Sequence, residues 1–187
     1  MYKNISTWLL KISSTWLMIA SLLLMAGFLI LVLPAQAAVS FQESGSERSP
    51  DTTFYYTPEA LYQMAEEYGA KGRQAYIQTR WTFDLVFPLV YTCFLAVGIS
   101  WFVQRLNGWA DAWKLTNLIP VLGGSFDLLE NSAATLAMSS FPAKPQILLS
   151  AASLFTPIKW VLVGASFIPY FVFVLAWLIR QIQSRNN

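Results

Sequence analysis

The sequence contains no histidine and only one cysteine, Cys93. A single cysteine cannot form an intramolecular disulfide, and without histidine the usual ligand sets of zinc and haem sites are missing. The commonest general base near neutral pH is missing as well. We therefore expect no metal and no cofactor. Cys93 lies in an apolar run, which predicts a small core residue rather than a reactive thiol.

The chain is also poor in charge. Only 12% of its 187 residues are charged, while 56% are hydrophobic and 16% are aromatic; an ordinary soluble domain has about 25% charged residues. This composition is typical of a membrane protein with several spans, because aromatic residues are favoured in lipid and at its interfaces. The net charge is only +2 and no basic run is interleaved with aromatic residues, which excludes nucleic acid as a partner. Membrane lipids are the expected surroundings.

Four apolar stretches are each close to the roughly 20 residues that a helix needs to cross ~30 Å of hydrocarbon. They are Trp16–Leu33, Phe83–Val103, Leu115–Met138 and Ile158–Ile179. The sequence therefore predicts an all-α fold, a polytopic membrane helical bundle of four transmembrane helices plus an extracytoplasmic amphipathic helix. We expect a single membrane domain over residues 1–187, with spans at about 14–34, 80–104, 115–138 and 157–181.

The first stretch has two interpretations. Lys3 and Lys11 precede it, and the segment Leu33–Ala38 at its end contains an Ala-x-Ala pattern that a signal peptidase recognises. The apolar run is longer than the ~7–15 residues of a typical signal-peptide core. We therefore favour a retained helix over a cleaved signal peptide, and the later spans keep the same orientation in either case.

The distribution of charge favours cytoplasmic termini. In that orientation the inner segments carry six basic residues and one acidic residue, whereas the outer segments carry six of each. The positive-inside rule counts only basic residues, and by that count the two sides are tied. Arg48, however, lies in a long outer loop, where charge matters less. We expect a multi-pass protein of the cell membrane with both termini in the cytoplasm.

The outer segment between the first two spans divides into a flexible part and a helix. Residues 38–56 are polar and rich in turn-forming residues, which predicts flexibility. Thr57 is suited to cap a helix and Pro58 to begin it, and apolar residues then recur at helical spacing over Leu61–Tyr68. The pattern predicts an amphipathic helix over residues 57–71, lying on the outer membrane surface or capping the bundle.

The chain that follows is predicted to bend at Gly69 and to run as one helix from about Arg73 into the second span. Pro88 has no amide hydrogen, so it should kink this span and leave the carbonyl of Asp84 without its usual partner. In the second outer loop, Gln146–Phe155 is expected to lie flat as a short helix of its own.

The third apolar stretch carries Asp127, Glu130 and Asn131 on one broad face of the predicted helix. An ionisable residue at the centre of a span costs ~2.5–3.5 kcal/mol, so such residues normally face the bundle interior and have a partner. At ~1.5 Å per residue, Asp127 lies near the midplane, and Arg80 and Asp84 of the preceding helix fall in the same outer half as this cluster. The sequence therefore predicts a polar pocket that opens outward, with the surface helix as its lid.

Two carboxyl groups within one helical turn repel each other in low dielectric, so one is expected to hold a proton, as acid/base catalysis and proton coupling require. The candidate catalytic residues are therefore Asp127 and Glu130. The expected ligand-binding residues are Arg80, Asp84, Asn131, Tyr76, Tyr91, Lys159 and Tyr170. Purely structural roles are the alternative: a local ion pair for Arg80 and Asp84, headgroup contact for Lys159, and packing for the tyrosines.

Three functions fit this pattern. The first is a small membrane protein whose pocket binds an amphipathic or lipid-like ligand. If it is an enzyme, the expected reaction is isomerisation, which needs no cofactor. The second is an accessory or assembly subunit of a larger membrane complex, whose polar residues pair with partner helices. The third is a homo-oligomeric transporter coupled to protons or cations. The sequence favours the first and leaves open whether the ligand is turned over.

Overall fold

A computed structural model describes residues 2–36, 50, 53–106 and 111–185, which form helices and no strand. The elements in chain order are α1 (Tyr2–Ile12), α2 (Thr15–Gly27), η1 (Phe28–Val32), α4 (Pro58–Glu67), α5 (Gly69–Trp81), α6 (Phe83–Arg105), η3 (Asp111–Leu118), α7 (Ile119–Ser139) and α8 (Gln146–Arg185). The predicted all-α fold is confirmed. Most of the segment predicted to be flexible, residues 38–56, lies outside the described residues.

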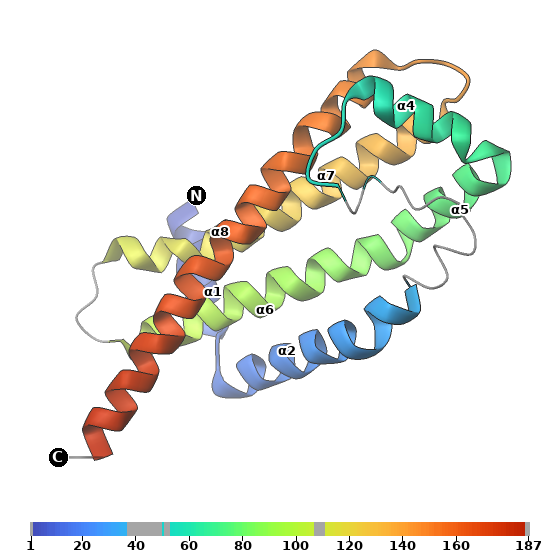
Figure 1. The fold of residues 1–187 in the computed structure, drawn as a ribbon. Coiled ribbons are helices and arrows are strands. Elements are labelled where there is room, and N and C mark those ends of the chain that lie inside the picture. The colour runs from blue at the N-terminus through green and yellow to red at the C-terminus, as the bar shows by residue number, and fades with distance from the viewer. Residues whose placement is uncertain (1, 37–49, 51–52, 107–110, 186–187) are drawn as a thin grey trace.

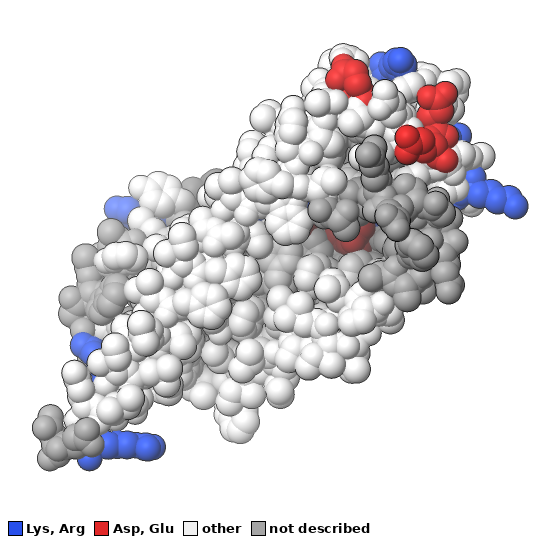
Figure 2. Space-filling model, in the orientation of Figure 1, with Lys and Arg blue, Asp and Glu red and all other residues white. Residues whose placement is uncertain are grey.

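Three helices in the described part of the chain are long and apolar enough to cross a membrane. They are Thr15–Gln36, Gly69–Arg105 and Gln146–Arg185. In the face shown in Figure 2, acidic and basic residues gather at the upper right end and basic residues at the lower left end. A broad, largely uncharged surface lies between the two ends. These features are compatible with a membrane protein. Helix α7, which carries the polar cluster, is not among the three, so its membrane crossing stays a prediction.

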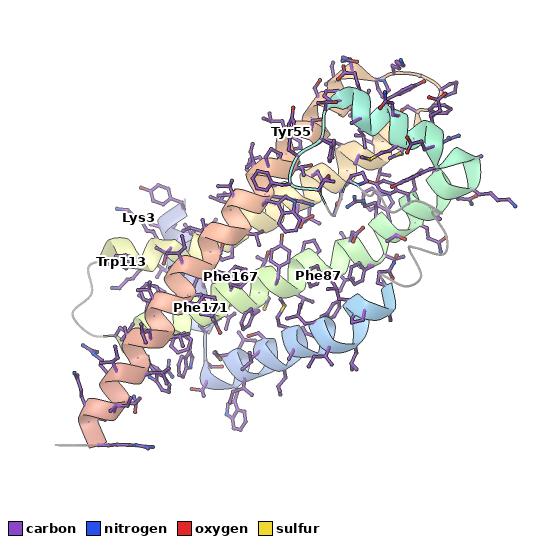
Figure 3. All side chains as sticks on the ribbon, viewed as in Figure 1. Lys3, Tyr55, Phe87, Trp113, Phe167 and Phe171 are labelled. Atoms are coloured by element: carbon purple, nitrogen blue, oxygen red, sulfur yellow. The ribbon has the colours of Figure 1, made fainter. Side chains whose placement is uncertain are left out.

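Helices α6, α7 and α8 form the centre of the molecule. Helix α7 packs most extensively along α8, and α6 contacts both of them, while α2 packs on α6 (Figure 1). Helix α4 lies across the start of α8 and the end of α7, and we call this the α4 end. The opposite, α1 end holds α1, η3 and the end of α8. Figure 3 shows Lys3 and Trp113 toward the α1 end and Tyr55 beside α4.

The predicted surface helix is α4. The side chain of Thr57 accepts a hydrogen bond from the amide of Ala60 at 3.1 Å, and Pro58 is the first helical residue. The helix ends at Glu67, short of the predicted residue 71. It ends there because Gly69 adopts a φ of +61°, a conformation that glycine tolerates and other L-residues rarely adopt.

The predicted helix from Arg73 into the second span is present but is interrupted at one residue, Thr82. Thr82 has a non-helical backbone (φ −113°, ψ −84°), so α5 ends at Trp81 and α6 starts at Phe83. Arg73 belongs to α5 and turns back toward α4, where its guanidinium donates a hydrogen bond to the carbonyl of Ala65 at 2.7 Å. The break separates the two helices by one residue and leaves them running in sequence along the same side of α7.

The prediction that Gln146–Phe155 forms a separate flat helix is wrong. This segment is the beginning of α8, a single helix of 40 residues that contains Pro157 and Pro169. At 1.5 Å per residue α8 is about 60 Å long, twice the ~30 Å of a hydrocarbon core. Leu149 and Ala152, near its start, are buried against α4 and α7, and this packing holds the extra turns in line with the span.

Two apolar cores lie at different levels of the bundle. The core at the α4 end joins α4, α7 and the start of α8 through small and aliphatic residues, among them Leu61, Ala134 and Ala152. The other core is aromatic and joins α6 to the second half of α8, with Phe94 and Phe173 among its buried members. The prediction that Cys93 is a core residue is wrong, because this side chain is exposed on the outside of α6.

At the α1 end of the bundle, hydrogen bonds join α1 and the start of α2 to η3 and α6. The Asn117 amide donates to the carbonyl of Ser6 at 3.2 Å and to the hydroxyl of Ser100 at 2.9 Å. Trp101 donates from its indole nitrogen to the hydroxyl of Thr15 at 3.2 Å. Because Asn117 and Ser100 are fully buried, these contacts replace water at a place where an unpaired polar group would be costly.

Candidate functional site

The polar residues predicted on the third apolar stretch lie on α7 and face the other helices. Glu130 is fully buried and Asn131 nearly so, whereas Asp127 keeps a small exposed fraction. Three other elements bring side chains to this face: α5, α6 and α8. The result is one connected polar network inside an apolar bundle, which is the arrangement expected of ionisable residues that must avoid lipid.

Lys159 of α8 lies between the two carboxyl groups. Its ammonium group donates hydrogen bonds to Oε2 of Glu130 and, at 3.4 Å, to Oδ1 of Asp127. The lysine side chain is buried, so it does not extend to the headgroup region. The shared cation offsets part of the repulsion between the Asp127 and Glu130 carboxyl groups.

A second part of the network joins α5, α6 and α7 through Asn131. Arg80 donates to Oδ1 of Asn131 at 2.5 Å and lies 3.5 Å from the carboxylate of Asp84. The Asn131 amide nitrogen in turn donates to the backbone carbonyl of Asp84 at 2.8 Å and to Oδ1 of Asp127 at 3.3 Å. The Asp84 carbonyl is the one that Pro88 was expected to leave without its helical partner, and Asn131 supplies the missing donor.

Tyrosines extend the network in two directions. Tyr91 of α6 donates to Oδ2 of Asp127 at 2.9 Å, and Tyr76 of α5 accepts a hydrogen bond from Arg80 at 2.7 Å while its ring lies under the guanidinium. Tyr170, in contrast, lies in the aromatic core, with its ring 5.0 Å from that of Phe94. The structure therefore brings eight of the nine predicted site residues together and separates Tyr170 from them.

Sequence reasoning missed Tyr56, which precedes α4. Its side chain is buried and its hydroxyl donates to Oε1 of Glu130 at 3.1 Å. Burial, followed by the negative charge of Glu130, raises the pKa of Tyr56 above its ordinary value. No local pattern predicts this contact, because Tyr56 lies in a segment that reads as a polar loop. Its only signal is that it stands in the aromatic stretch Phe54–Tyr56 directly before the α4 cap.

A cavity of about 100 Å³ adjoins the network between α7 and the break that separates α5 from α6. Its polar walls come from Arg80, Asp84, Asn131 and Ser132, and its apolar walls from Trp81, Leu85 and Leu128. The exposed fractions of Trp81 and Leu85 are 52% and 37%, so these two residues form part of its open rim. Asp127 and Glu130, the candidate catalytic pair, do not line this cavity.

The described residues contain no group of three or more cysteine, aspartate and glutamate side chains placed to hold a metal ion. Chemically, the network offers buried ion pairs, and the cavity offers a partly exposed carboxylate, that of Asp84, beside an apolar wall. No family model, curated protein or solved structure matches the chain.

Proposed function

We propose that the chain is an integral membrane protein with four spans that binds the polar head of an amphipathic, lipid-like ligand in the cavity beside Arg80, Asp84 and Asn131. Helix α7 is the fourth span. Its 21 residues extend about 32 Å, enough to cross the hydrocarbon core. Its low hydropathy comes from polar residues that are buried among the other helices and so do not meet lipid.

The proposed orientation follows the charge distribution, with the α4 end outside the cell and both termini in the cytoplasm. The acidic residues of α4 then lie on the outer side, and Arg180 and Arg185 at the end of α8 lie on the inner side. The hydrogen bonds that α1 and α2 accept from η3 and α6 support a retained first helix.

The observation that carries the binding proposal is the mixed lining of the cavity. A ligand site usually combines mostly apolar walls with a few fixed polar groups. Here Trp81 and Leu85 form an open apolar rim, while Arg80 and Asn131 are held rigidly by the buried network behind it. In the proposed membrane the rim faces lipid, so a ligand can enter from the bilayer with its chains remaining in the hydrocarbon.

The proposal is for binding rather than turnover. A general acid or base must come within hydrogen-bond reach of the reacting group. Asp127 and Glu130 are held by Lys159, Tyr91 and Tyr56 and do not reach the cavity. Their part in this proposal is to position the network that supports the cavity wall.

The test fills the cavity without touching the ionic network. Ser132 lines the cavity, and Ser132→Leu places a larger side chain in it; the matched control is Leu136→Phe, one turn further along α7, where the native side chain is 50% exposed. Both variants and the wild type are purified in mild detergent, and retained lipid is measured by native mass spectrometry. We expect the wild type and Leu136→Phe to retain lipid and Ser132→Leu to lose it. Equal retention by all three contradicts the proposal.

Proton movement is a second candidate, favoured by one specific observation. Hydrogen bonds connect Tyr91, Asp127, Lys159, Glu130 and Tyr56 in a chain that leads from within α6 to the segment before α4. In proteoliposomes containing a pH-sensitive dye, this candidate requires a proton flux that Tyr56→Phe slows. Proteoliposomes that conduct no protons at any pH eliminate it.

A further inference from the structure

The hydrogen-bond donors on the cavity wall are committed to the protein itself. Arg80, with a side chain only 2% exposed, donates to Asn131 and to Tyr76 and pairs with Asp84. The two amide hydrogens of Asn131 go to the Asp84 carbonyl and to Asp127. An amide nitrogen has no third hydrogen to give, and the Arg80 side chain is almost wholly buried, so neither side chain presents a donor to a ligand.

The acceptors, in contrast, are presented to the cavity. The side chain of Asp84 is 17% exposed and lines the cavity, and a carboxylate has about four acceptor positions. The hydroxyl of Ser132 donates its hydrogen to the carbonyl of Leu128 at 2.8 Å, so toward the cavity its oxygen acts as an acceptor. A ligand that matches this wall must therefore bring hydrogen-bond donors.

We propose that the ligand of this cavity has a primary ammonium head, an inference that rests on the binding function proposed above. An ammonium group has three N–H donors and carries the charge that a carboxylate favours, and charge-assisted hydrogen bonds are roughly twice as strong as neutral ones. The volume of about 100 Å³ is that of about three water molecules, which suits an ammonium group with its adjoining methylene groups. The Asp84 carboxylate and the Ser132 hydroxyl accept its hydrogen bonds.

The apolar rim indicates that the amine belongs to an amphipathic molecule. Trp81 and Leu85 are the exposed members of the lining, and they give no hydrogen-bond partner to a small hydrated amine. They offer contact area to the glycerol and upper chain carbons of a lipid whose head enters the cavity. A lipid with an ethanolamine head combines both features, whereas a choline head has the same charge on nitrogen but no N–H donor.

The experiment offers the full-length purified protein an equimolar mixture of three lipids with identical chains and ethanolamine, choline or glycerol heads, and reads occupancy by native mass spectrometry. We expect the ethanolamine lipid to exceed each of the others by about tenfold or more, since hydrogen bonds to charged groups are strong enough for that ratio. Free ethanolamine in water is a separate arm, in which the rim predicts much weaker competition. Equal competition by free ethanolamine and the ethanolamine lipid refutes the membrane source of the amine.

Two variants assign the selectivity to the cavity. Asp84→Asn is expected to abolish the preference for ethanolamine, while Glu59→Gln, an acid-to-amide change at an exposed position of α4, is expected to keep it. The wild-type ratio tests the inference even where Asp84→Asn does not fold. If Ser132→Leu loses the lipid but the wild type shows no preference among the three head groups, the ammonium inference is refuted and the binding function stands. If Ser132→Leu retains as much lipid as the wild type, both the ammonium inference and the binding function are refuted.

Discussion

The charge on Lys159 should be the largest single contributor to the stability of the polar network. Its ammonium group is buried and is shared by Glu130, which is fully buried, and by Asp127. Replacing it in Lys159→Met keeps much of the side-chain volume but leaves the Glu130 carboxylate with the Tyr56 hydroxyl as its remaining side-chain donor among the described residues. Removing one partner of a buried ion pair typically costs about 3–5 kcal/mol, and we expect a loss in that range.

The measurement is the free energy of unfolding in mixed micelles of mild detergent and SDS, followed by circular dichroism. The matched control is Lys144→Met, which removes an exposed lysine that lies 4.3 Å from the centre of the Tyr62 ring and should cost about 0.5–1 kcal/mol. The double variant Lys159→Met with Glu130→Gln removes both charges and should regain about half or more of the loss. Equal costs for the two single lysine variants would refute the reasoning, as would a double variant no more stable than Lys159→Met.

Three further predictions follow from particular contacts. Because its pKa is raised above the ordinary value of 10, Tyr56 holds its proton in the folded protein after the unfolded chain has lost it; stability should fall as pH rises above about 10, and less so in Tyr56→Phe. In Gly98→Ala the new Cβ would lie 2.5 Å from a ring carbon of Tyr170, which should cost about 1–3 kcal/mol; Gly164→Ala, in open space, should cost nothing in the same unfolding assay. A nitroxide on Cys93, which is exposed on α6, should be relaxed by oxygen dissolved in the bilayer and not by a water-soluble nickel complex.

Much of the fold can be predicted from the sequence because its signals are local. Apolar runs near 20 residues locate the long helices, and the Thr57–Pro58 pair locates the start of α4. The link between Pro88 and the Asp84 carbonyl is also local, since the residues are four apart and the missing amide hydrogen follows from proline chemistry. The sequence could not say which donor replaces that hydrogen, because Asn131 comes from a different helix.

The errors have physical reasons as well. Tyr170 shares a helical face with Lys159, since eleven residues make just over three turns. They also advance about 16 Å along the axis at 1.5 Å per residue, which carries Tyr170 past the ionic network and into the aromatic core. The break at Thr82 has no glycine or proline to mark it, and the long helix α8 is continuous through Pro157 and Pro169. In these places tertiary packing outweighed local preference.

The position of the cavity follows from the broken helix. At Thr82 the chain leaves helical geometry, and Arg80 and Asp84, which lie two residues on either side of Thr82, remain paired across the break. Within α6, Pro88 leaves the Asp84 carbonyl without its helical donor, and lipid supplies no polar partner. Asn131 provides one for the Asp84 carbonyl, and to do so it must be held in place by Arg80 and Asp127. The Asn131 part of the network is therefore required by Pro88, and the break lies beside the cavity that Asp84 lines.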